Sequence, residues 1–192
     1  MAILILGLIL FLGVHSTRIL APGLRESAVR SMGLLPWKGL YSVISLVGFV
    51  LIIWGYGEAR YTPTWVWVSP DWTRHITALL LLPAFILLAA AYVPGTHMKA
   101  RLGHPMALGV KLWAFAHLLS NGTVADILLF GAFLAWAILY YAIARRRDRA
   151  EGVTYKAISA QRDLIAVVIG LVFYGAFAFV LHEWLIGVRP FG

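Results

Sequence analysis

The chain has 192 residues, of which 61% are hydrophobic and only 12% charged, with a mean hydropathy of +0.86. Soluble domains average roughly 45–50% apolar residues, so this composition excludes an ordinary soluble domain and indicates an integral membrane protein. The net charge of +8 does not indicate nucleic-acid binding, because the basic residues fall in loops between apolar runs and form no folded basic domain. The absence of cysteine excludes disulfides, thiolate metal ligands and iron–sulfur clusters.

Apolar runs recur along the chain at the length of membrane-spanning helices. About 20 helical residues cross the ~30 Å hydrocarbon core of a bilayer, and the pattern predicts about six such helices. We therefore expect an all-α fold, a polytopic helical bundle, with residues 1–192 forming a single domain. The predicted spans are Ala2–Leu20, Gly39–Gly57, Ile76–Val93, Pro105–Leu119, Ile127–Ala144 and Leu164–Leu181.

The first run is interpreted as a retained span and not as a signal peptide. No Lys or Arg precedes it, and Ala21 followed by Pro22 makes a poor cleavage site. The segment that follows, residues 18–38, is basic and contains the breakers Pro22, Gly23 and Pro36. This composition predicts a loop between the first two spans.

The fourth predicted span is short and carries the most polar side chains. Pro105–Leu119 is about 22 Å long at 1.5 Å per residue, which is marginal for a crossing that faces lipid. We therefore expect this helix to be largely surrounded by other helices. Pro105 suits a first helical turn, and Asn121 with Gly122 predicts a cap or turn after it.

The basic residues are distributed unequally between the two sides of the predicted bundle. Thirteen of the sixteen Lys and Arg residues fall on the side of the first, third and fifth connections, the exceptions being Arg60, Arg74 and Arg189. Cytoplasmic loops are enriched in Lys and Arg. The distribution therefore predicts that both termini lie outside the cytoplasm.

Two histidines within predicted spans are candidate metal ligands. His117 lies among apolar residues of the fourth span, where a neutral imidazole suits an axial position on haem iron or a hydrogen bond to another helix. His15 lies in the first span, and Arg18 follows it at a distance suited to pairing with a haem propionate. A histidine near a helix end, in the membrane interface, is the alternative interpretation of His15.

A second group of polar residues lies where the fourth span begins. Arg101 and His104 are candidates for binding an anionic group, or for contacts with lipid headgroups. Lys111 shares a helix face with His104 and is expected to extend toward the surface, whereas His117 lies roughly 120° around the helix. The remaining histidines have no predicted ligand role: His75 and His97 are expected in loops, and His182 beside Glu183 in a structural pairing.

Three stretches carry a resemblance to a known family. They are GVHSTRILAPGLRESAVRSMG at Gly13–Gly33, WKGLYSVISLVGFVLIIWGYGEAR at Trp37–Arg60 and GHPMALGVKLWAFAHLLSNGTVADILLFG at Gly103–Gly131. The chain resembles the NnrU family of bacterial membrane proteins, and also the related zeta-carotene isomerase of plants and cyanobacteria. The similarity covers nearly the whole chain.

The resemblance implies a cofactor and two classes of function. The isomerase holds a b-type haem between two histidines, which correspond to His15 and His117. A cysteine three residues before the second histidine takes part in its redox-linked ligand exchange, and Ala114 occupies that position here. The resemblance implies a protein of the bacterial inner membrane. Its function would be either a redox-linked role in nitrite and nitric oxide metabolism (denitrification) or the isomerisation of a polyene. Its partner would be a hydrophobic polyene or a redox protein.

Two other classes of function stay open at this point. Arg101, Gly103, His104, Pro105 and Gly109 resemble the S-adenosylmethionine-binding motif of membrane methyltransferases. Those enzymes carry paired glutamates beyond the motif, whereas residues 145–162 contain Glu151 alone as a glutamate, which disfavours methyl transfer. The other alternative is a non-catalytic membrane partner or assembly factor of a reductase. The sequence predicts no substrate and no oligomeric state.

Overall fold

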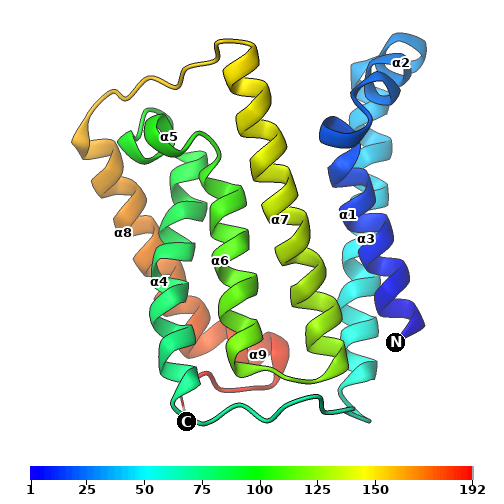
Figure 1. The fold of residues 1–192 in the computed structure, drawn as a ribbon, viewed down its shortest axis with the longest axis vertical. Helices are drawn as coiled ribbons and strands as arrows, with labels where there is room; N and C mark the ends of the chain where they lie inside the picture. The colour runs from blue at the N-terminus through cyan, green and yellow to red at the C-terminus, as the bar shows by residue number, and fades with distance from the viewer. Residues whose placement is uncertain (192) are drawn as a thin grey trace. The chain divides into compact units, whose positions relative to one another are not determined.

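The computed structural model describes residues 1–191, and these are helical apart from short connections (Figure 1). An isolated bridge between Trp65 and Thr123 is the sole strand-like pairing in the described chain. The expected all-α fold is confirmed. The helices are α1 (Ala2–Leu20), α2 (Pro22–Met32), α3 (Leu34–Ala59), α4 (Thr73–Tyr92), α5 (His97–Leu102), α6 (Pro105–Ser120), α7 (Val124–Ala150), α8 (Ala160–Ala176), the π-helical turn η1 (Phe177–Leu181) and α9 (His182–Ile186).

Each predicted span corresponds to a helix. Five segments of the described chain are long and apolar enough to cross a membrane: α1, α3, α4, α7 and the continuous stretch Ala160–Ile186. The protein is therefore an integral membrane protein. Helix α6, with 16 residues, is shorter than these five. Only Met106 and Phe115 of α6 are exposed, and the helix packs against α4 and α5.

Three segments predicted as loops are helical. Residues 18–38 contain helix α2, which begins at Pro22 and ends before Gly33. Proline is tolerated in the first turn because the N–H that it lacks has no partner there, so Pro22 starts a helix instead of breaking one. His75 lies in the first turn of α4, and His97 is the first residue of α5.

Contacts divide the chain into two compact units. The first contains Met1–Trp67 and Thr123–Ala132, and the second contains Val68–Gly122 and the chain from Phe133 onward. In the first unit α1 packs against α3, with α2 joining them. In the second unit α4 packs against both α6 and α8. Helix α7 begins in the first unit and continues in the second.

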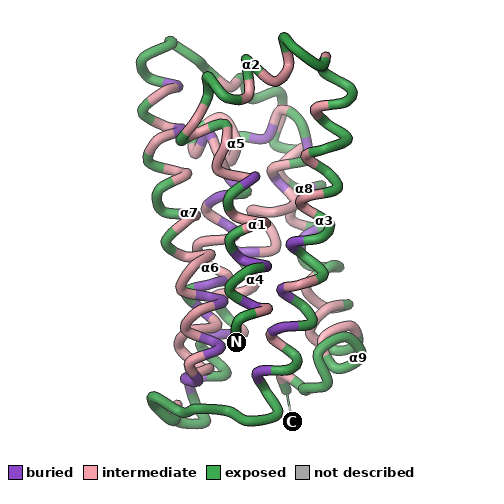
Figure 2. Tube along the Cα trace, turned by 90° about the vertical axis from the view of Figure 1, so that its right-hand side faces the viewer, coloured by how far each residue is buried: buried purple, intermediate pink, exposed green. Residues whose placement is uncertain are grey.

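Glycines bring the backbones of α1 and α3 together. A Cβ atom on Gly48 would lie 2.7 Å from the backbone nitrogen of Phe11, and one on Gly7 would lie 2.6 Å from that of Ile52. Gly55 meets the backbone of Leu4 in the same way. The order of these contacts makes the two helices antiparallel. Gly7, Gly48 and Gly55 thus form a glycine seam where α3 packs closely on α1. The other faces of α3 are mostly exposed (Figure 2).

Glycines also allow close helix packing in the second unit, where a hydrogen bond adds to the contact. A Cβ on Gly109 of α6 would lie 3.0 Å from the carbonyl oxygen of Ala84, and one on Gly170 of α8 would lie 2.6 Å from Cα of Ile86. The buried hydroxyl of Thr77 donates to the carbonyl oxygen of Ala116 (2.8 Å). Helix α4 is thereby held to α6 and α8, which fixes the rotation of α6 about its axis.

We predict that Gly48→Leu disrupts the packing of α1 on α3. The new side chain has no space beside Phe11, and overpacking of this kind costs on the order of 1–3 kcal/mol or more. Gly39→Leu on the same helix is the matched control, because a Cβ there meets nothing within 4 Å. Thermal unfolding in detergent should show a lower midpoint for Gly48→Leu alone. Equal midpoints for the two variants would contradict this account of the seam.

Candidate functional site

His15 is held on α1 by its own backbone and by aromatic rings. Its ring Nδ1 lies 2.6 Å from the carbonyl oxygen of Phe11, one turn earlier. The imidazole stacks on the Phe11 ring at 4.2 Å between centroids, and the ring of Tyr41, on α3, lies 5.3 Å away. A carbonyl oxygen only accepts, so in the neutral ring Nδ1 carries the proton and Nε2 the lone pair. The half-buried His15 is thus in the tautomer that ligates through Nε2.

His117 repeats this arrangement on α6. Its Nδ1–H donates to the carbonyl oxygen of Trp113 (2.9 Å), and the two rings lie 5.2 Å apart. The side chain of Asn121 donates to the carbonyl oxygen of His117 (2.8 Å), so Asn121 ends the helix as predicted. Ala114 is completely buried on the same helix. Nε2 is again the nitrogen that carries the lone pair.

Both histidines meet a requirement of metal ligands in proteins. A ligating histidine usually donates its other ring N–H to a carbonyl or carboxylate, which fixes the orientation of the ring.

The predicted haem-binding residues lie in different parts of the fold. His15 belongs to the first compact unit and His117 to the second. Arg18 lies in the last turn of α1 and is exposed. No group of three or more His, Asp or Glu side chains that could hold a metal ion occurs among residues 1–191.

His104, at the other end of α6, is partly buried and is hydrogen-bonded to a buried carboxylate. It occupies the position before the first turn, and its Nε2–H donates to Oδ2 of Asp148 (2.9 Å) near the end of α7. Nη1 of Arg145 lies 3.8 Å from the same carboxylate oxygen. The carboxylate is 5% exposed. Tyr155 lies beside the same carboxylate. Burial raises the pKa of its phenol, and the negative charge of Asp148 and a hydrogen bond to Asp148 raise this pKa further.

The surroundings of His104 fix it between helices. Its ring lies edge-on to Tyr140 and Tyr155, at 6.1 and 5.9 Å between centroids. Nζ of Lys111 lies 5.8 Å from the ring centroid of Tyr141. His104 and Lys111 thus share a face toward α7, in agreement with the prediction, while Arg101 is exposed on α5.

Asp148 is the residue of this site that the sequence analysis missed. It stands among four arginines, a context typical of a solvated charge run, and the fifth span was expected to end at Ala144. Helix α7 instead continues to Ala150, and the completely buried Ala144 lies one turn before Asp148 on the same face. Because the burial of Ala144 is known only from the structure, the sequence offered no signal for the role of Asp148.

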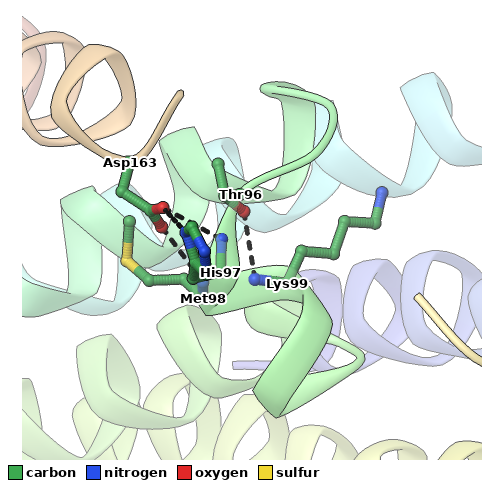
Figure 3. A network of polar contacts seen from close by, with 5 residues as sticks. All are labelled: Thr96, His97, Met98, Lys99 and Asp163. Atoms are coloured by element: carbon green, nitrogen blue, oxygen red, sulfur yellow. Dashed lines mark hydrogen bonds and ion pairs between the residues drawn. The ribbon is translucent and has the colours of Figure 1, made fainter. Parts of the chain in front are cut away.

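The histidines for which no ligand role was predicted include His97 and His182, and both have hydrogen-bond partners within the protein. Asp163 accepts from the backbone nitrogen (3.0 Å) and Nδ1 (2.7 Å) of His97 and from the backbone nitrogen of Met98, which docks α5 on α8 (Figure 3). His182 donates through Nδ1 to the carbonyl oxygen of Val188 (2.7 Å). Glu183 pairs with Arg189 at 2.7 Å.

A second buried carboxylate, Asp126, lies in the first turn of α7. It accepts from the hydroxyl of Tyr56 on α3 (2.6 Å) and from the backbone N–H and hydroxyl of Thr123. This pattern caps α7 and ties it to α3 within the first unit. Its hydrogen bonds mark it as a structural group.

We predict that Asp148→Ala destabilises the second unit. The substitution leaves the partly buried His104 without its acceptor, which costs on the order of 1–3 kcal/mol. Asp71→Ala removes a carboxylate that is 99% exposed and 4.0 Å from Arg74, so it should change stability by less than about 0.5 kcal/mol. Unfolding midpoints in detergent compare the two variants. An Asp148→Ala midpoint equal to that of Asp71→Ala would show that the contacts of Asp148 do not stabilise the unit.

Comparison with known proteins identifies the family. No curated protein and no solved structure matches the chain. The family model described as NnrU protein matches residues 3–190, nearly the whole chain. The chain belongs to the NnrU family of membrane proteins.

Proposed function

We propose that this NnrU-family membrane protein binds haem b, with His15 and His117 as axial ligands. The observation that carries the proposal is the shared geometry of the two residues. Each lies within a helix of the bundle and donates Nδ1–H to the carbonyl oxygen four residues earlier, at 2.6 and 2.9 Å. Each therefore carries its lone pair on Nε2, as an axial haem ligand does.

The neighbouring residues suit the same role. Phe11, Tyr41 and Trp113 provide aromatic surface beside the two imidazoles. The exposed Arg18, one turn after His15, is the proposed partner of a haem propionate. When bound, the haem would supply one-electron exchange or a Lewis-acidic iron. Ala114 offers no sulfur and the chain has no cysteine, so a thiolate could not replace a histidine on a bound haem.

The proposed cofactor would support a redox-linked role in the bacterial inner membrane. We propose a role in nitrite and nitric oxide metabolism, with a redox protein as partner, or the isomerisation of a polyene within the bilayer. Because cytoplasmic loops are enriched in Lys and Arg, we propose that the side with most of these residues faces the cytoplasm and that both termini lie on the opposite side. Arg101 and His104 lie on the proposed cytoplasmic side, where Arg101 is exposed and available to an anionic group.

The alternative functions have less support. His104 would have to contact S-adenosylmethionine in a methyltransferase, but its Nε2–H is already donated to the buried Asp148. A purely structural role for His15 and His117, as in an assembly factor, predicts that neither residue affects a bound cofactor.

Visible spectra of the purified protein test the proposal. We expect wild-type protein from haem-replete cells to show a Soret band that shifts on reduction. His15→Ala and His117→Ala should each lower the affinity for haem by about 10-fold or more. His75→Ala is the control, because this exposed residue at the start of α4 has no proposed role.

Two results would count against the proposal. A protein that shows no Soret band after haem-replete expression does not bind haem. A Soret band that is the same in wild type, His15→Ala and His117→Ala means that other residues hold the iron.

A further inference from the structure

An apolar groove runs along α1 in the first unit, on a face that the proposed haem ligands do not use. Its volume is about 580 Å³. Its centre lies about 120° around the helix from His15, at 100° per residue. The groove is lined by Leu8, Ile9, Leu12, Gly13, Ser16, Thr17, Leu20, Ala21, Leu24 and Ala132.

The length and chemistry of the groove fit a hydrocarbon chain. From Leu8 to Leu20 it extends about 18 Å along the helix, close to the ~15 Å of hydrocarbon in one leaflet. The hydroxyls of Ser16 and Thr17 donate to the carbonyl oxygens of Leu12 (2.6 Å) and Val14 (2.8 Å) within the helix. These two polar groups are therefore already satisfied, and the rest of the lining is apolar.

The groove ends at a basic surface helix. Leu20 is 67% exposed and Leu24, in the first turn of α2, is 60% exposed. Arg25 follows Leu24 directly, and α2 also carries Arg30 against a single acidic residue, Glu26. No residue of α2 is buried, and the helix joins two membrane spans. These are the features of a helix that lies at the headgroup level of a bilayer.

We propose that this groove binds one acyl chain of an anionic phospholipid, with the headgroup at Arg25. The apolar lining selects a hydrocarbon chain, and the charge of α2 selects a negative headgroup, each basic residue near the membrane adding attraction to anionic lipid. The site is independent of the haem proposal because it uses another face of α1. A second copy of this chain, seated on the same face, is the competing occupant.

A glycine in the groove provides a matched test. A Cβ on Gly13 meets nothing within 4 Å, so Gly13→Phe fills the groove without a clash against the protein. Gly39→Phe makes the same change at an equally open position on α3, outside the groove. Native mass spectrometry of delipidated protein, titrated with phosphatidylglycerol or phosphatidylcholine, measures the affinity. We expect wild type and Gly39→Phe to prefer phosphatidylglycerol, and Gly13→Phe to lose this binding.

Charge variants test the headgroup. Arg25→Gln should reduce the preference for phosphatidylglycerol about fivefold, whereas Arg30→Gln, roughly 140° away around the same helix, should change it less. Equal binding by Gly13→Phe and Gly39→Phe overturns the proposal, and so does equal affinity of wild type for the two lipids. A dimeric wild type that becomes monomeric in Gly13→Phe assigns the face to a second copy instead.

A labelling experiment covers the case in which Gly13→Phe does not fold. The chain has no cysteine, so Leu24→Cys and Glu26→Cys each introduce one site for a fluorophore, on opposite faces of α2. Phosphatidylglycerol with a spin-labelled acyl chain should quench the fluorophore at 24 strongly and the one at 26 weakly. Equal quenching at the two positions overturns the proposal.

Discussion

Within a bilayer there is no hydrophobic driving force between apolar helices, because lipid tails are as apolar as their side chains. Both units therefore depend on close backbone packing at small residues. Gly48 and Gly55 let α3 approach the backbone of α1, and Gly109 and Gly170 let α6 and α8 approach α4. Each glycine fixes which face of its helix is turned inward. The polar residues of the same helices are positioned as a consequence, including His15 on α1 and His117 on α6.

A second constraint is that polar groups inside a membrane protein find partners within the protein. Asp126 and Asp148 are both almost fully buried, and each accepts hydrogen bonds from another part of its own unit. Thr77 joins α4 to α6 by the same principle. His15 and His117 each satisfy one ring nitrogen, Nδ1, by a hydrogen bond to a carbonyl oxygen of their own helix, which fixes the orientation of the imidazole ring.

Much of the fold could be predicted because apolar length and breakers report directly on membrane helices. The short helix α6 was predicted from the apolar run after Pro105, and the family from its motifs. Helix α2 was missed because Pro22 and Gly23 break a helix in its interior but are tolerated in a first turn. Asp148 was missed because its partner His104 lies 44 residues away in sequence, and no local pattern encodes such a pairing. The tautomers of His15 and His117 likewise required coordinates.

The proposed function rests on His15 and His117 holding the same haem iron. Electron paramagnetic resonance of the oxidised protein tests it most directly, because two axial imidazoles give low-spin ferric iron and the loss of one gives high-spin iron. We expect a low-spin signal in wild type and a high-spin signal in both His15→Ala and His117→Ala. A high-spin wild type, or a low-spin signal that persists in either variant, would contradict it.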